Sequence, residues 1–197
     1  MTHELERLYG NETWFSEIAA YVDERYSVIE ERLVQTFRYV QLHPDNGDTF
    51  SYEFISILRD CGSVFTSALD KAIRETQHQT KGELNIGHFR DFLNSAIPTI
   101  SQRPILVLPL SPRVLLPYSA FAKSKSKPRW WDSYNNVKHS EVDNYKDGNL
   151  RNVMNAIGAL AILCEEMGIF LELSIFTSIG IKYPLDMILF PDSQEDV

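Results

Sequence analysis

The residues with the clearest capacity for chemistry lie between positions 128 and 139, where the sequence reads PRWWDSYNNVKH. His139 is the central candidate, because an imidazole titrates near neutral pH and can either donate or accept a proton. Asn135 precedes it by about one helical turn, and Lys138 is its neighbour in the chain. An amide and a cation beside a histidine predict a polar site at this end of the segment.

Pro128 is suited to open a helix here, because a proline in the first turn loses no hydrogen bond. Successive side chains on a helix are about 100° apart. Two stripes result, the apolar Trp130, Tyr134 and Val137 and the more polar Trp131, Asn135 and His139. His139 points away from the centre of the apolar stripe, so it should face solvent, a cleft or a partner.

This segment and the helix after it resemble the HEPN superfamily of small helical domains. The family motif is an arginine, a polar residue that is often Asn, three variable residues and a histidine. Asn135 and His139 match the polar and histidine positions, whereas Tyr134 stands where the family has its arginine. The longer form Tyr-Asn-x-x-Lys-His is similar to that of a HEPN-like subgroup of bacterial proteins. The resemblance covers roughly the second half of the chain.

The resemblance implies an up-and-down helical bundle that binds RNA or cleaves it without a metal or other cofactor. Many family members are endoribonucleases of toxin–antitoxin or phage-defence systems, so an antitoxin or another partner protein is implied. Their sites are commonly built across a homodimer. On this basis His139 would transfer protons, Asn135 would orient it or the phosphate, and Tyr134 would complete the motif.

A cation is needed to stabilise the charge on the phosphate, and Tyr134 cannot supply one. Lys138, Arg129 and Arg151 are the candidates to replace the arginine. Candidate RNA contacts are Lys125, Lys127, Arg129, Trp131, Lys138 and Arg151, and Lys123 belongs to the same basic segment. The alternatives are a solvated basic loop, core packing for Trp131 as for Trp130, and ordinary surface for the Arg151, Asn152 and Asn155 patch.

Composition narrows the class of protein. The net charge of -8 over 197 residues argues against a general nucleic-acid coat protein. No apolar run reaches the roughly 18 residues of a membrane span, and the polar N-terminus resembles no signal peptide. Cys61 and Cys164 fall in apolar helical patterns, which predicts buried free thiols in a cytoplasmic protein. The histidines lack metal-ligand spacing.

Hydrophobic periodicity predicts a mainly α-helical single domain over residues 1–197. A helix over 12–41 and a second one capped by Asp48 or Thr49 and running to about residue 73 should form an antiparallel hairpin. A shorter helix should carry residues 89–97. A helix from the Asn149 cap to Gly168 has a near-continuous apolar stripe. Small residues at 156, 158 and 159 should admit another helix.

Residues 103–127 predict an extended insertion and basic linker, in which 105–110 and 114–118 form a β-hairpin-like pair. Pro109 and Pro117 should confine these segments to edge or irregular strands. Residues 169–190 are apolar and ambiguous, with a strand-like alternation at Leu171, Leu173 and Ile175. The competing interpretation of the whole chain is a non-catalytic helical interaction protein whose motif survives as a dimer interface.

Overall fold

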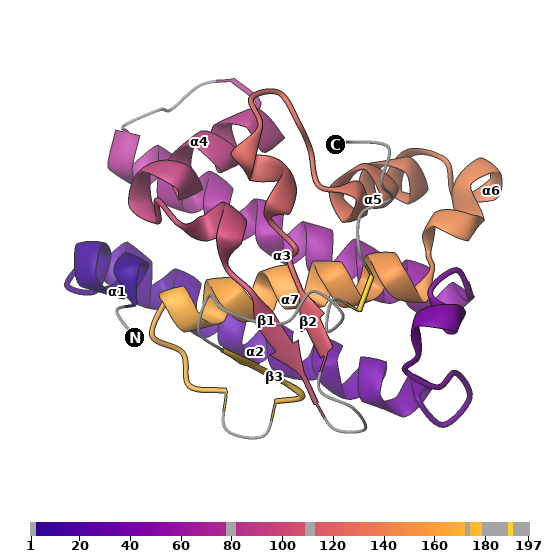
Figure 1. The fold of residues 1–197 in the computed structure, drawn as a ribbon. Coiled ribbons are helices and arrows are strands. Elements are labelled where there is room, and N and C mark those ends of the chain that lie inside the picture. Colours follow the sequence, from indigo (N-terminus) through magenta and orange to yellow (C-terminus); the bar gives the residue numbers. More distant parts are fainter. Residues whose placement is uncertain (1–2, 78–81, 109–112, 172–173, 179–188, 191–197) are drawn as a thin grey trace.

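The computed structural model describes residues 3–77, 82–108, 113–171, 174–178, 189 and 190 (Figure 1). Within these ranges the chain is mainly helical, with seven α-helices and a small three-stranded antiparallel sheet, which confirms the predicted helical class. The helices are α1 (Glu4–Tyr9), α2 (Thr13–Thr36), α3 (Tyr52–Gln77), α4 (Ile86–Ala96), α5 (Arg129–His139), α6 (Glu141–Asn144) and α7 (Leu150–Glu166). The strands are β1 (Ile105–Val107), β2 (Arg113–Leu115) and β3 (Phe176–Ser178).

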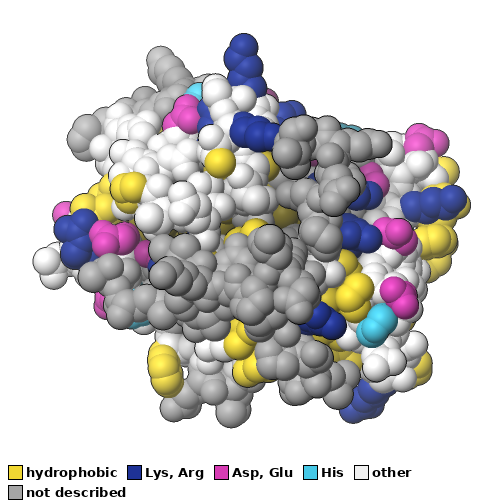
Figure 2. Space-filling model, in the orientation of Figure 1, with side chains coloured by type: hydrophobic (Ala, Val, Ile, Leu, Met, Phe, Trp, Pro, Cys, Tyr) yellow, Lys and Arg dark blue, Asp and Glu magenta, His cyan; other side chains and the backbone are white. Residues whose placement is uncertain are grey.

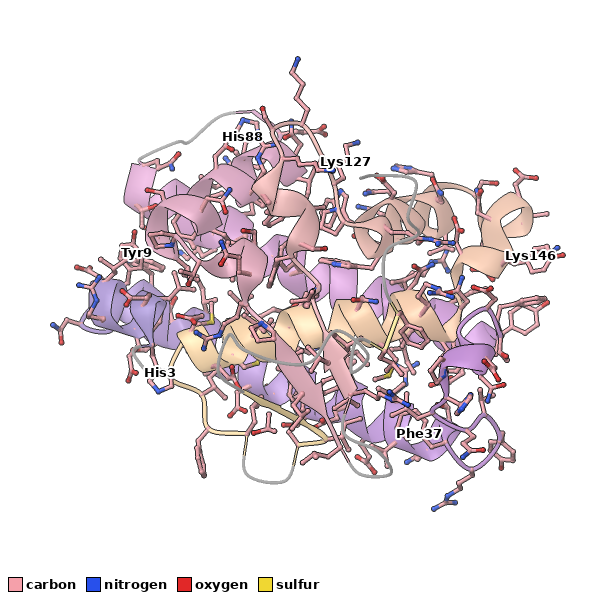
Figure 3. The ribbon with its side chains drawn as sticks, viewed as in Figure 1. His3, Tyr9, Phe37, His88, Lys127 and Lys146 are labelled. Atoms are coloured by element: carbon pink, nitrogen blue, oxygen red, sulfur yellow. The ribbon has the colours of Figure 1, made fainter. Side chains whose placement is uncertain are left out.

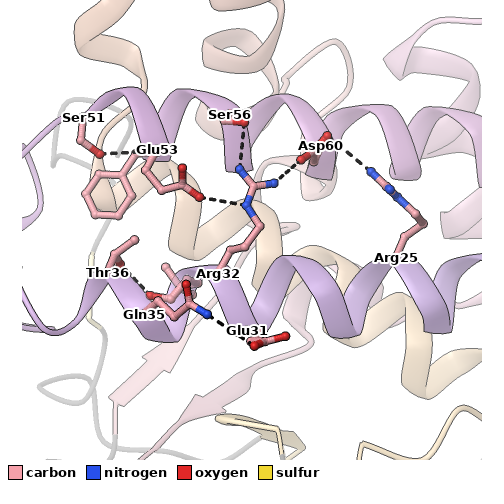
Figure 4. A network of polar contacts seen from close by, with 11 residues as sticks. Arg25, Glu31, Arg32, Gln35, Thr36, Ser51, Glu53, Ser56 and Asp60 are labelled. Carbon is pink, nitrogen blue, oxygen red and sulfur yellow. Dashed lines mark hydrogen bonds and ion pairs between the residues drawn. The ribbon is translucent and has the colours of Figure 1, made fainter.

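The predicted hairpin of long helices is present as α2 and α3. Arg32 of α2 donates to Glu53 at 2.8 Å and to Asp60 at 2.5 Å on α3 (Figure 4). Arg25, two turns earlier on α2, reaches the same Asp60 at 3.5 Å. The earlier arginine therefore pairs with the later part of α3, which is the antiparallel arrangement.

The boundaries of these two helices differ from the prediction. Helix α2 ends at Thr36 rather than near residue 41, because the Phe37 N–H already bonds the carbonyl of Val34 in a tighter turn. Ser51, not Asp48 or Thr49, caps α3, and its hydroxyl accepts from the Phe54 N–H at 3.0 Å. Phe50 therefore lies outside the helix and is 45% exposed, although the apolar stripe assigned it to the core.

Helix α7 is the central element, and all of its predicted stripe is buried. Asn149 caps it as predicted, accepting from the Asn152 N–H at 3.0 Å. Gly168 ends it at φ +75°, and the Ile169 N–H bonds the Cys164 carbonyl at 3.0 Å. This is the pairing of a Schellman motif, in which glycine tolerates the left-handed conformation.

The sheet has the order β2-β1-β3 and lies over α7 (Figure 1). Ile105 pairs with Leu115 in the predicted hairpin and with Ser178 on the other side. Strand β1 is therefore central, which corrects the expectation that both segments would be edge or irregular strands. Its neighbour β3 starts at Phe176, one residue beyond the alternating segment. Leu173 and Pro109 lie outside the described residues.

The small residues of α7 serve this sheet. A Cβ atom at Gly158 would lie 3.2 Å from a Leu115 methyl and 3.3 Å from an Ile105 methyl. The close approach predicted at this position is thus made by strands, not by another helix. Helix α1 was not predicted, and it is joined to the end of α7 by a hydrogen bond from the Glu4 N–H to the Glu166 carboxylate at 2.8 Å. None of the helices described here is long and apolar enough to cross a membrane.

Candidate functional site

Helix α5 carries the predicted motif and packs antiparallel along α3. Arg59 of α3 donates to the carbonyl of Val137 at 2.7 Å, and Gly62 lies against the ring of Tyr134. Further along α3, Phe65 meets Trp130 with 5.3 Å between ring centroids. The apolar stripe of α5 is therefore used entirely for packing on α3.

The two tryptophans of α5 are both buried. Trp130 is 2% exposed and its indole N–H donates to the Pro117 carbonyl at 2.9 Å. Trp131 is 7% exposed, and its ring contacts those of Phe65, Phe89, Trp130 and Tyr134. These contacts leave Trp131 little free face for stacking on a base, so the core alternative describes its surroundings.

The polar stripe of α5 becomes more exposed toward the end of the helix. Asn135 is half-buried and donates through its amide nitrogen to the Trp131 carbonyl at 2.9 Å. This bond leaves the amide oxygen available as an acceptor. His139 is exposed, as the helical projection predicted.

A cavity of about 790 Å³ opens beside this stripe, between α5, the end of α3, the start of α4 and the linker. Its α5 wall consists of Trp131, Tyr134, Asn135, Lys138 and His139. Lys125 and Lys127 contribute from the linker, which loops over α4 and descends to α5 (Figure 3, where Lys127 is labelled). The structure thus gathers seven of the predicted site residues around one space.

The remaining wall brings in charged residues that the sequence did not single out. They are Asp70 and Arg74 of α3, Glu83 before α4, and Arg90 of α4. Basic side chains outnumber acidic ones among the lining residues, and dark-blue side chains stand along the upper edge of the face in Figure 2. A cavity with an excess of positive charge favours an anionic ligand, even in an acidic protein.

Most of these cations are held by carboxylates. Arg74 bonds Asp70 at 2.6 Å, and this hydrogen bond raises the pKa of Arg74. Arg90 pairs with the exposed Asp91 at 2.8 Å, and Lys127 lies 3.8 Å from Asp132. The ammonium of Lys138 instead lies over the ring of Tyr134, 5.3 Å from its centroid.

Lys125 adopts a left-handed backbone conformation, with φ +68°. This region is uncommon for residues other than glycine, and strained residues are enriched where the surrounding structure fixes a ligand site. Lys125 is exposed at the rim of the cavity. The rim of the site is thus held in a conformation that the basic composition of the linker could not reveal.

Arg129 and Arg151 do not line the His139 cavity. Both lie beside a separate recess of about 20 Å³, with Asn155 and Phe190. The guanidinium of Arg151 pairs with Asp48 at 3.4 Å and lies 5.0 Å from the centroid of the Phe190 ring. The structure therefore separates these two arginines from the other predicted RNA contacts, which leaves Lys138 as the nearest replacement for the motif arginine.

Asn152 corrects the expectation of a polar surface patch on α7. It is 1% exposed, and its amide donates to the Ser133 hydroxyl at 2.8 Å and to the Asp147 carbonyl at 2.9 Å. The side chain joins α7 to α5 and to the turn between them. A polar residue among apolar ones on this helix marked an interhelical hydrogen bond instead.

The cysteines offer no nucleophile. Cys61 and Cys164 are both free and buried, as predicted, and burial raises the pKa of each thiol. Among the described residues, no three His, Cys, Asp or Glu side chains gather in a way that could hold a metal ion.

Comparison of this chain with protein-family models, with curated proteins and with solved structures gives no match. The fold and the cavity are therefore interpreted from their own geometry, together with the motif resemblance on α5.

Proposed function

We propose that this protein binds RNA in the His139 cavity and that His139 serves there in metal-independent acid–base cleavage. The supporting observation is the convergence of an exposed histidine, a half-buried amide and the three lysines at 125, 127 and 138 around one cavity. The volume of about 790 Å³ is in the range of ligand sites and suits a short single-stranded segment.

Cleavage at this site would follow the usual chemistry of a 2′-hydroxyl. A base removes the proton from that hydroxyl, its oxygen attacks phosphorus, the bond to the 5′-oxygen breaks, and an acid returns a proton to that oxygen. His139 is the exposed group able to take one of these parts, and the lysines supply positive charge for the phosphate. The resemblance on α5 further suggests a homodimer, in which a second His139 would take the other part.

Binding without cleavage is the second candidate, and a specific observation favours it. Tyr134 stands at the arginine position of the motif, is 4% exposed and packs against Gly62. It therefore brings no charge to the phosphate. In that case the protein acts as an RNA-binding or interaction module in a toxin–antitoxin or phage-defence setting, and an antitoxin is the implied partner.

Incubation of RNA with the purified protein in EDTA separates these candidates. The proposal expects cleavage that His139→Ala abolishes and that His43→Ala leaves unchanged, because His43 is an exposed histidine outside the cavity. RNA binding without cleavage would favour the second candidate. A protein that neither binds nor cleaves RNA at low salt would contradict both.

A further inference from the structure

The ring of Tyr134 is fixed by its surroundings. A Cβ atom at Gly62 would lie 2.3 to 2.5 Å from three of its ring carbons, so only glycine leaves room for the ring on α3. On its other contacts the ring meets Trp131, with 5.4 Å between the centroids. Because both neighbours are buried, the ring cannot turn aside without repacking the α3–α5 interface.

Lys138 follows Tyr134 by one helical turn, so the two side chains lie on the same side of α5. The Lys138 ammonium is 5.3 Å from the centroid of the Tyr134 ring. An ammonium within about 6 Å of an aromatic ring is attracted to the negative charge of its face. Tyr134 therefore directs an exposed lysine along the wall of the His139 cavity.

The ring attracts the ammonium without neutralising it. The other cations on the walls are paired: Arg74 with Asp70, Arg90 with Asp91, and Lys127 with Asp132. None of the ion pairs among the residues that the structure describes involves Lys138. Lys125 is absent from these pairs as well, but it lies on the linker rather than beside His139 on the motif helix.

On the basis of the function proposed above, we infer that Tyr134 is a positioning residue for Lys138, which binds the RNA phosphate beside His139. The resembled motif places an arginine at position 134. Here an aromatic ring occupies that position, and the cation comes from the next turn of the same helix. The pair thus replaces one guanidinium by a lysine that is held by a buried tyrosine.

A double-mutant cycle tests this pairing by measuring the affinity for a short fluorescent single-stranded RNA. Tyr134→Leu should weaken binding about two- to fivefold, which is the contribution of an exposed cation–π contact. The same change should have no effect in a Lys138→Met background, because the ammonium is already gone. Tyr134→Phe keeps the ring and should bind as the wild type does.

An equal loss from Tyr134→Leu with and without the lysine would show a purely structural role and overturn the inference, as would no loss at all. If Tyr134→Leu does not fold, fluorinated phenylalanines at position 134 keep the ring shape while weakening the negative face. Affinity should then fall stepwise with fluorination, and a constant affinity would overturn the inference. A wild type that binds no RNA would instead overturn the proposed function itself.

Discussion

Gly62 of α3 lies against the ring of Tyr134 on α5, so close that an added Cβ atom would be 2.3 Å from the ring carbon Cδ2. This contact sets the spacing of the two helices that form one corner of the His139 cavity. It also explains why an apolar helix such as α3 carries a glycine in its interior, where glycine is otherwise unfavourable.

Gly62→Ala should therefore destabilise the protein by about 1–3 kcal/mol, because the methyl group overpacks a buried contact between ring and backbone. The free energy of unfolding in urea measures this effect. Ser63→Ala, on the exposed side of the same helix, is the control and should change stability little. Combining Gly62→Ala with Tyr134→Leu should cost less than the sum of the two single changes, and strict additivity would argue against the contact.

The buried hydrogen bonds of Asn152 give a second prediction. Asn152→Ala leaves the Ser133 hydroxyl and the Asp147 carbonyl without this donor, which should cost about 1–3 kcal/mol of unfolding free energy. Asn155→Ala is the matched control, because that amide is half-buried and bonds only the Arg151 carbonyl of its own helix in the contacts described. Similar stabilities for the two variants would contradict the structural role of Asn152.

The two cysteines should be unreactive in the native protein. Burial raises the pKa of both thiols, so the reactive thiolate is scarce at neutral and mildly alkaline pH. A thiol-specific chromogenic reagent should modify neither Cys61 nor Cys164 at pH 8 and should modify both in denaturant. Rapid modification of either one in the folded protein would show that its helix does not occupy the core as described.

Long-period features of the fold were predictable from the sequence. The apolar stripes of α3, α4 and α7 and the caps of α7 depend on local spacing and on residue type, which the chain displays directly. The hairpin of β1 and β2 was also predictable, since two short apolar segments flank a turn-forming stretch. Its third strand was not, because Phe176–Ser178 pairs with residues about 70 positions earlier.

The candidate site shows the same division. The outward position of His139 and the apolar role of Trp130 follow from helical geometry on α5. The sequence could not separate Arg129 and Arg151 from the cavity lysines, because the separation depends on which side of α5 faces α7. Arg74 and Arg90 were missed for a related reason: each is an ordinary polar residue of its own helix, and only packing brings both to the cavity.

The cavity lysines provide the most direct test of the account. A triple variant with Lys125→Ala, Lys127→Ala and Lys138→Ala removes three charges from the cavity. Its control removes three exposed charges elsewhere, through Arg129→Ala, Lys71→Ala and Lys146→Ala. The two variants have equal net charge, so any difference between them reports position.

The decisive measurement is the affinity for single-stranded RNA as a function of salt concentration. The cavity variant should lose most of its affinity, and its log–log salt slope should fall by about 2, or about 0.7 for each lost phosphate contact. The control should keep nearly the affinity and slope of the wild type. Equal losses in the two variants would show that RNA responds only to overall charge and would contradict a binding site at the His139 cavity.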